Sequence, residues 1–233
     1  MAFDEDYAVA DASATESVRF TSPPSLDLVH QLRRNCDCVL VGKGTVVRDD
    51  CTLTVRRVDL FPHQNNIQPA RVVIDSNLEI LSRDDDVYKY ALLKDGHRVI
   101  IYHSCDQTHE HEKALQDIPN LALEKLSKSK DGNISVRDVL QNLREVHDIH
   151  HCMVEGGPAT ALPFLQEKFV DRAMIVKAPM KFNDPVVSNI NNDVLIDAGL
   201  ELIDTINVGD DVVEYWVKSG QEWPTKNVAD WPM

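Results

Sequence analysis

The chain has 233 residues, with 24 basic and 38 acidic side chains, so its formal net charge is −14. This charge argues against binding to nucleic acids or to anionic membranes, because both attract proteins through clusters of Lys and Arg. It is compatible with a phosphorylated small molecule, because a few well-placed Arg residues suffice to bind one phosphate. No apolar run approaches the roughly 18 residues that a membrane-spanning helix requires.

The N-terminal segment 1–17 is acidic and lacks the basic and apolar regions of a secretory signal. The five cysteines are odd in number and show no spacing of a disulfide framework, which is typical of a reducing compartment. No Cys or His pair repeats at the spacing of a zinc site. We therefore expect a cytoplasmic protein that binds no metal.

Taken in chain order, the hydrophobic pattern alternates between helical and strand-like segments. Apolar residues at 26, 28, 29 and 32 recur at helical spacing, and Ser22 or Ser25 can cap this helix. CVLVG at 38–42 is a continuous apolar run of the kind found in strands buried on both faces. Further strands are expected at 70–76, 98–103, 121–126, 151–157, 173–179, 200–208 and 211–217, and helices at 109–117, 135–147 and 159–168, with 85–93 weakly helical.

Strands that alternate with helices through short connections predict a mostly parallel sheet. We expect an α/β fold of three layers, with helices on both faces of this sheet. The last two strands follow each other without a helix between them, which predicts antiparallel edge strands at the C-terminal end. No composition break divides the chain, so we expect one domain over residues 1–220, followed by a polar tail at 221–233.

In open parallel sheets, ligands bind beyond the carboxyl ends of the strands. At the first such exit, Gly42 and Gly44 allow a tight turn, while Thr45 offers a hydroxyl and Asp49 a carboxylate. The segment is not the dinucleotide fingerprint G-x-G-x-x-G, because Val47 occupies the position of its third glycine. Paired glycines are also common in ordinary turns, so both interpretations stay open from spacing alone.

A second strand exit has Glu155 at the end of an apolar run, where a carboxylate is costly unless it has a partner or faces a cleft. Gly156 and Gly157 then lead into a predicted helix, whose free N–H groups suit a phosphate. The alternative is a strand-to-helix turn with a helix-capping acid. Arg33 and Arg56 either bind a phosphate bidentately or are solvated. Spacing alone indicates a nucleotide-using α/β enzyme and no more.

Three segments together resemble the reductases of riboflavin biosynthesis. They are GKGTVVRDDCTLTVR at 42–56, QPARVVIDSNLEI at 68–80 and MVEGGPATALPFLQEKFVDRAMIVKAPM at 153–180. The family includes stand-alone diaminopyrimidine reductases and the reductase half of the bifunctional deaminase–reductase. The resemblance covers roughly residues 2–217 and implies the dihydrofolate-reductase-like fold.

The resemblance implies an oxidoreductase that uses NADPH to reduce the ribosyl side chain of 2,5-diamino-6-(ribosylamino)-4(3H)-pyrimidinone 5′-phosphate to a ribityl chain. The deaminated compound, 5-amino-6-(5-phosphoribosylamino)uracil, is the alternative substrate. The zinc signature of the deaminase half does not occur in the sequence, which favours the diamino compound. Hydride transfer requires positioned reactants rather than a covalent nucleophile, and the sequence offers no nucleophile constellation. The family also implies a homodimer.

The resemblance implies roles for individual residues as well. Glu155 is expected near the reacting sugar, where it would orient hydroxyls, stabilise a cationic imine or act as an acid. Further substrate contacts are implied for Ser17, Arg33, Leu53 and Arg56. Cofactor contacts are implied for Arg19, Thr45, Asp49 and Ser76, and for a phosphate-binding helix start formed by Gly157, Pro158, Ala159, Thr160, Ala161, Leu162 and Pro163.

The first block of the family is altered in this chain. The family begins with a strand that leads into S-x-D-G-K, whereas here Asp4 replaces Ser and Tyr7 replaces Gly, and the strand is expected to be short or absent. This change motivates a second hypothesis, a non-catalytic reductase-like protein that binds a nucleotide or a protein partner. A third, a pterin or dihydrofolate reductase, is disfavoured because the apolar face of the first helix has no carboxylate; its nearest titratable residue is His30.

Overall fold

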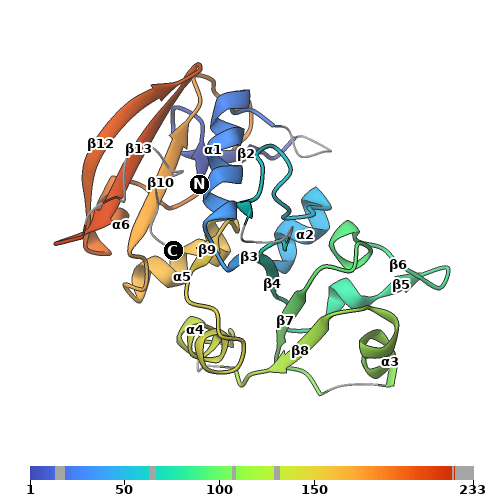
Figure 1. Ribbon diagram of the computed structural model, residues 1–233. Helices are drawn as coiled ribbons and strands as arrows, with labels where there is room; N and C mark the ends of the chain where they lie inside the picture. The colour runs from blue at the N-terminus through green and yellow to red at the C-terminus, as the bar shows by residue number, and fades with distance from the viewer. Residues whose placement is uncertain (14–18, 63–66, 107–108, 129–131, 222, 224–233) are drawn as a thin grey trace. The chain divides into compact units, whose positions relative to one another are not determined.

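The computed structural model describes residues 1–13, 19–62, 67–106, 109–128, 132–221 and 223 (Figure 1). The chain forms two compact units. One unit is Arg33–Gly156, and the other combines Met1–Leu32 with Gly157–Met233. The first helix, α1 (Pro23–Arg34), begins in the second of these units and ends in the first.

The unit Arg33–Gly156 is built on a five-stranded sheet in the order β8-β7-β4-β3-β9. Each neighbouring pair in this sheet is parallel. The inner strands are rich in Val, Ile and Leu and are almost fully buried, as expected for a parallel sheet covered on both faces. The strands are β3 (Cys38–Gly42), β4 (Ala70–Ile74), β7 (Val99–His103), β8 (Leu121–Lys125) and β9 (Cys152–Val154).

Helices cover both faces of this sheet. One face packs in a single hydrophobic cluster against α2 (Lys43–Asp49), α3 (His109–Asp117) and the 3₁₀ turns η2 (Glu79–Leu81) and η3 (Ala91–Leu93). The other face bears α4 (Val136–Glu145), where the Asn142 side chain accepts a hydrogen bond from the Tyr102 hydroxyl at 2.9 Å. Ser135 caps α4 by accepting the N–H of Asp138. The predicted α/β layering with a parallel sheet is confirmed.

The other unit contains a four-stranded sheet in the order β1-β10-β13-β12. β1 (Ala2–Phe3) is parallel to β10 (Arg172–Lys177), whereas β13 (Asp211–Lys218) is antiparallel to β10 and to β12 (Leu200–Val208). One hydrophobic cluster joins this sheet to α5 (Pro158–Gln166) and α6 (Asn192–Asp197). β2 (Ala8–Asp11) pairs separately with β11 (Pro185–Val187). The predicted antiparallel strands near the C-terminus are confirmed.

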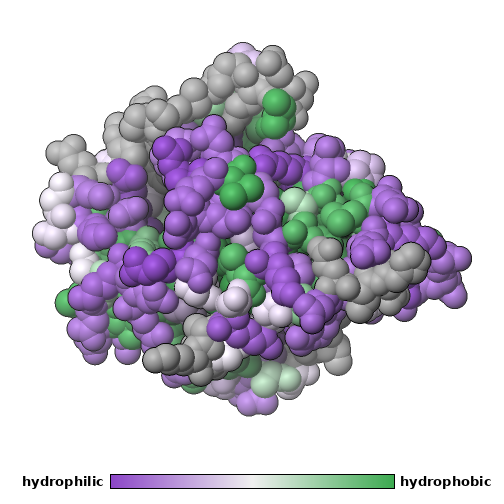
Figure 2. Space-filling view, turned by 90° about the horizontal axis from the view of Figure 1, so that it is seen from below, coloured by the Kyte–Doolittle hydropathy of each residue, from purple (hydrophilic) through white to green (hydrophobic). Residues whose placement is uncertain are grey.

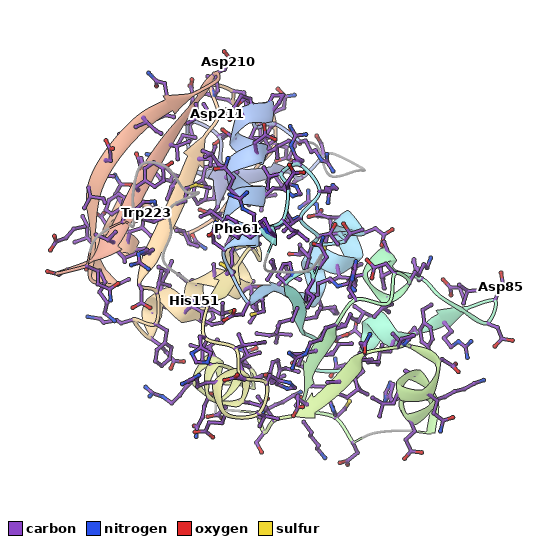
Figure 3. The ribbon with its side chains drawn as sticks, in the orientation of Figure 1. Phe61, Asp85, His151, Asp210, Asp211 and Trp223 are labelled. Atoms are coloured by element: carbon purple, nitrogen blue, oxygen red, sulfur yellow. The ribbon has the colours of Figure 1, made fainter. Side chains whose placement is uncertain are left out.

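Residues 85–93 form no α-helix, and only their last three residues are helical, as a 3₁₀ turn. They belong to a short hairpin between β5 (Arg83–Asp84) and β6 (Val87–Tyr88), followed by η3. Asp85 and Asp86 both have positive φ, 49° and 64°, which is the backbone of a two-residue type I′ turn. Figure 3 shows Asp85 at the outer end of this hairpin. The short elements α2, α6, β1, β2 and β11 were not predicted as such, and most of the tail 221–233 lies outside the described residues.

The face shown in Figure 2 is mostly hydrophilic, as the composition predicts. Several large apolar side chains are nevertheless exposed in the described part of the chain, among them Ile196 on α6 (57%) and Leu202 and Ile203 on β12 (46% and 47%). β12 lies at one edge of its sheet. Among the residues that the structure describes, no helix combines the length and the apolar character needed to cross a membrane.

Arg71 at the start of β4 is the largest side chain buried in the unit Arg33–Gly156, at 1% exposure. Its Nη1 and Nη2 donate to the two carboxylate oxygens of Asp95 at 2.8 and 2.6 Å, and Nη2 also donates to the carbonyl of His97 at 2.9 Å. Burial by itself raises the pKa of Asp95, but the hydrogen bonds from Arg71 and from the His97 N–H outweigh it and lower that pKa. The pair therefore stabilises the charged carboxylate.

Replacing Asp95 tests this pair, in which Arg71 is buried and the Asp95 side chain is 32% exposed. Asp95→Ala leaves the Arg71 guanidinium buried without its counter-charge, so we expect the free energy of unfolding to fall by about 2–3 kcal/mol in urea titrations at neutral pH. Because the pKa of Asp95 is lowered in the folded state, this contribution is complete above the ordinary carboxyl pKa and fades as the pH falls below it. The control is Asp106→Ala, whose ion pair with Lys125 is exposed and should be worth less than about 1 kcal/mol. Equal losses in the two variants would contradict the assignment.

Candidate active site

The two strand exits singled out from the sequence lie at one edge of the same sheet. β3 and β9 are adjacent and parallel, with Cys38 opposite Cys152 and Leu40 opposite Val154. The backbone N–H of Glu155 continues this pairing by donating to the carbonyl of Leu40 at 2.9 Å. Parallel strands end at the same edge, so the chain leaves β3 toward α2 and leaves β9 at Glu155 on one side of the sheet.

Arg33 and Glu155 form a close bidentate ion pair. The Nε and Nη2 groups of Arg33 each donate to a different carboxylate oxygen of Glu155, both at 2.6 Å. The side chains are only 11% and 15% exposed. Burial alone lowers the pKa of Arg33, but the hydrogen bonds and charge of Glu155 raise it above its ordinary value. Burying the Glu155 carboxylate at the end of β9 would be unfavourable without a partner, and Arg33 is that partner.

The loop 52–56 is held against this pair. Arg33 Nη1 donates to the carbonyl of Thr54 at 2.9 Å. Gln68 binds both backbone groups of the next residue, Val55. Its Oε1 accepts the N–H of Val55 at 2.7 Å, and its Nε2 donates to the Val55 carbonyl at 3.1 Å. Sequence reasoning missed this role of Gln68, although the residue opens the QPAR segment that pointed to the family.

The two predicted substrate contacts in this loop differ in what they can offer. Leu53 has a φ of 54° and a side chain buried in the hydrophobic cluster of the sheet, at 3% exposure. Only its backbone is therefore available to a ligand. Arg56 is exposed, and its Nη1 donates to the hydroxyl of Thr52 at 3.1 Å. An exposed guanidinium can bind a phosphate bidentately.

Three predicted cofactor residues of this unit lie just beyond the sheet. Thr45 and Asp49 lie on α2, which follows β3 without a break; Gly42 caps this helix and supplies no side-chain hydrogen bond to its first turn. Ser76 follows β4, and its carbonyl accepts the N–H and the hydroxyl of Ser104 at 3.1 and 3.2 Å. The backbone link joins the loops that leave β4 and β7. These residues are thus at the carboxyl edge, where a ligand of an open sheet is expected.

His103, at the end of β7, adds an unexplained polar atom at this edge. Its side chain is fully buried, and burial lowers the pKa of its imidazole. Nδ1 lies 3.1 Å from the carbonyl of Cys105, whereas Nε2 has no hydrogen-bond partner among the described residues. A hydrogen-bonding group of a nucleotide would suit such a site, so the side chains of this unit fit a nucleotide cofactor.

The predicted phosphate-binding segment forms the start of α5 in the other unit. Gly157 is the N-cap, with extended backbone and no side-chain cap, and Pro158 occupies the first turn, as expected. A Cβ added to Gly157 would meet nothing within 4 Å, so the helix start is open. Ala161 and Leu162 instead pack against the hydrophobic cluster of this unit. The open start of this helix fits the phosphates of a dinucleotide, although the N–H groups of Thr160 and Ala161 already donate to the carbonyl of Gly157.

The remaining predicted contacts are less well defined. Arg19 is exposed and lies outside the helices and strands. Ser17 lies outside the described residues. The ligand-contact roles of all these residues stay predictions, because positions alone do not test them.

Two thiols interact electrostatically with the Glu155 carboxylate. Burial, with smaller effects of Cys152 and Glu155, raises the pKa of Cys36 to about 12. Burial and, less strongly, Asp49 raise the pKa of Cys51 to about 12. Thiols with such pKa values are neutral at physiological pH and are poor nucleophiles. The surroundings of the Arg33–Glu155 pair therefore do not suit covalent thiol catalysis.

The rate of alkylation tests the raised pKa values of Cys36 and Cys51. At pH 8 only about 10⁻⁴ of a thiol with a pKa of 12 is ionised, so Cys36 and Cys51 should react with iodoacetamide about 10³-fold more slowly than ordinary cysteines. Their rates should rise about tenfold per pH unit as the pH is raised, because only the thiolate reacts. Peptide mass spectrometry after timed labelling gives both rates, and the unfolded chain in denaturant provides the control. Rapid labelling of the folded protein at pH 8 would contradict the assigned pKa values.

Comparison with known proteins identifies related sequences. The RibD C-terminal domain family model matches residues 8–213. The chain is 31% identical over 213 residues to the 2,5-diamino-6-ribosylamino-4(3H)-pyrimidinone 5′-phosphate reductase of Methanothermobacter thermautotrophicus, covering 89% of this chain and 92% of that protein. It is 36% identical over 166 residues to the riboflavin biosynthesis protein RibD of Aquifex aeolicus. That match covers 68% of this chain but only 39% of the longer RibD protein.

Solved structures show the same fold. RibD of Acinetobacter baumannii superposes with a TM-score of 0.71 at 21% identity, covering 93% of this chain and 56% of that chain. The riboflavin biosynthesis reductase Rib7 of Saccharomyces cerevisiae superposes with a TM-score of 0.65 at 18% identity, covering 93% of this chain and 86% of that one. The fold class inferred from the residues is thereby confirmed. With a family model that spans nearly the whole chain, this protein belongs to the family of the RibD C-terminal domain.

Proposed function

We propose that this protein is an NADPH-dependent reductase of riboflavin biosynthesis. Its substrate would be 2,5-diamino-6-(ribosylamino)-4(3H)-pyrimidinone 5′-phosphate, whose ribosyl side chain becomes a ribityl chain. The archaeal relative that bears this activity in its name matches along nearly its whole length, which favours the diamino substrate. The deaminated aminouracil compound is the alternative, because RibD proteins also match the chain.

The observation that supports this proposal most strongly is the Arg33–Glu155 pair beside the loop 52–56. It places one carboxylate, fixed in position, at the carboxyl edge of a parallel sheet, next to a loop that bears an exposed Arg56. A sugar phosphate offers matching groups: hydroxyls and a reacting carbon for the carboxylate, and a dianion for the arginine. Glu155 is the catalytic residue that we assign, with Ser17, Leu53 and Arg56 as further substrate contacts. The Nε, Nη1 and Nη2 groups of Arg33 are engaged by Glu155 and by the Thr54 carbonyl, so Arg33 acts at this site through Glu155.

The cofactor contacts remain those that the family resemblance implies. Thr45, Asp49 and Ser76 would bind at the sheet edge, Arg19 would contribute a cation, and the open start of α5 at residues 157–163 would bind phosphates. When bound, the nicotinamide supplies the hydride. The protein's own part is to hold the reacting carbon in line, to orient the sugar hydroxyls and to balance charge. No side chain of this set has to form a covalent bond.

The altered first loop supports the enzyme over the non-catalytic alternative. Asp4 is 1% exposed, and its carboxylate accepts the N–H groups of Asp6, Ala8 and Phe182 at 2.9, 2.8 and 3.1 Å. Tyr7 has a φ of 63°, a left-handed backbone conformation that glycine adopts most readily. The backbone N–H groups of residues 4–8 are therefore all hydrogen-bonded despite the exchanged residues, and β1 precedes them as a strand of two residues.

We also propose that the protein is a cytoplasmic homodimer. The exposed apolar residues Ile196, Leu202 and Ile203 on α6 and the edge strand β12 support an association of two copies. Sedimentation at micromolar concentration distinguishes a dimer from a monomer.

The activity itself is testable with purified protein. NADPH oxidation should require a pyrimidine substrate, and kcat/KM should be higher for the diamino compound than for the aminouracil compound. Glu155→Ala should keep the circular dichroism spectrum but lower kcat at least about 10²-fold, because the fixed charge at the reacting sugar is lost. The proposal fails if neither substrate supports NADPH oxidation, and binding of NADPH without turnover would favour the non-catalytic alternative.

A second test concerns phosphate recognition by Arg56. Arg56→Ala removes one charge-assisted contact, so kcat/KM for the phosphorylated substrate should fall about 10–100-fold, mainly through KM. The substrate without its 5′-phosphate should be affected little. Arg57→Ala, a neighbouring exposed arginine, is the matched control and should resemble the wild type. Equal effects on the phosphorylated and dephosphorylated substrates would contradict this role.

A further inference from the structure

The hydrogen bonds of the Arg33–Glu155 pair engage most of the guanidinium and one acceptor position on each carboxylate oxygen. Arginine has five N–H donors, of which Nε and Nη2 hold Glu155 and Nη1 holds the Thr54 carbonyl. The guanidinium plane is thus fixed at three points, on α1, on the residue after β9 and in the loop 52–56. Each Glu155 oxygen accepts one of these hydrogen bonds and keeps a second acceptor position. The carboxylate can therefore face a further group without leaving Arg33.

The pair is stable only while Glu155 is ionised. Both carboxylate oxygens act as acceptors at 2.6 Å, a distance typical of charge-assisted hydrogen bonds. If Glu155 took up a proton, the guanidinium, at 11% exposure, would lose its counter-charge while still buried. Breaking a buried pair in this way is strongly unfavourable. The raised pKa of Arg33 agrees with a mutual stabilisation of the two charges.

We propose that Arg33 is a positioning residue that fixes the orientation of the Glu155 carboxylate, so that Glu155 stabilises positive charge on the substrate and does not donate a proton. This inference rests on the proposed reductase function. It chooses among the three roles that the sequence leaves open for Glu155, and it assigns the proton to the solvent.

The chemistry of the reduction agrees with this division of labour. On ring opening, the C1′–O4′ bond breaks, O4′ keeps the electron pair and takes a proton from water, and the nitrogen lone pair forms a cationic C1′=N bond. C1′ then receives the hydride from the reduced nicotinamide that the proposed function supplies, and the positive charge on nitrogen disappears. The charge that needs stabilisation is therefore positive. A fixed anion lowers the energy of that state, as fixed dipoles do for anions elsewhere.

Two thiols that interact electrostatically with Glu155 do not act as acids in the neutral range. They are Cys36 and Cys51, which their raised pKa values keep neutral, with Asp37 and Asp49 acting on those thiols in turn. Arg33 is the cation hydrogen-bonded to Glu155.

The kinetic test compares variants that change geometry and charge separately. Arg33→Lys keeps the cation but cannot form the two parallel hydrogen bonds, so kcat should fall about 10–100-fold with an unchanged circular dichroism spectrum. Arg34→Lys is the matched control, since the neighbouring Arg34 instead donates to the carbonyl of Asp59 and lies over the ring of Phe61. Its kcat should stay within about twofold of the wild type. Wild-type kcat for Arg33→Lys would overturn the positioning role.

The pH profile and a spectrum of the free protein test the ionised state. A proton-donating Glu155 would make kcat decline toward alkaline pH, and Glu155→Gln would abolish this decline. We expect no such decline in the wild type between about pH 6 and pH 8. The infrared difference between wild type and Glu155→Gln, recorded without ligands, should show a carboxylate band and no protonated carboxyl band. An alkaline decline that depends on Glu155, or a protonated band, would overturn the proposal. Because the spectrum needs no substrate, it remains decisive even if the proposed reductase activity is absent.

Discussion

The parallel pairing of β3 with β9 is the constraint on which the site depends. It brings the chain out of the sheet at Glu155, directly after three residues of strand, and leaves a carboxylate where apolar packing would otherwise continue. Such a charge can persist there only with a partner, and Arg33 at the end of α1 provides it. The ion pair is thus a consequence of topology as much as of side-chain chemistry. Moving either element would leave a buried charge alone.

Three side chains from separate segments hold the loop that lies next to this pair. Arg33 bonds the carbonyl of Thr54, Gln68 bonds both backbone groups of Val55, and Arg71 reaches the carbonyl of Thr52 while it is anchored to Asp95. Leu53 contributes its side chain to the hydrophobic cluster of the sheet. A loop fixed by this many contacts presents its remaining group, the exposed Arg56, from a rigid base. Preorganisation of this kind limits the entropy lost when a ligand binds.

Much of the fold could be predicted from the sequence because its parallel strands are continuous apolar runs and its helices have caps and periodic apolar positions. CVLVG became β3, and the Ser135 cap began α4 as expected. Elements set by backbone conformation were harder to predict: the hairpin at Asp85–Asp86 depends on two non-glycine residues with positive φ, and α2 follows a strand without any capping signal. At the site, the meeting of Glu155 with Arg33 follows from residues 122 positions apart, a pairing that local patterns do not encode. The family resemblance suggested both residues, but not that they bind each other.

The first loop keeps a hydrogen-bonded backbone conformation although residues of the family motif are exchanged. One buried carboxylate, Asp4, gathers three backbone N–H groups, and this acceptor sets the path of the chain through Tyr7. Because the Asp4 carboxylate sets the path of the backbone, the glycine of the family motif is not required at position 7. Tyr7 takes its place, and its hydroxyl is hydrogen-bonded to Asn192 and Lys177. Relatives with the same exchanges in this loop would not be found by a search for the consensus residues of the motif. A pattern that asks for a buried acceptor two and four residues before its donors would recover them.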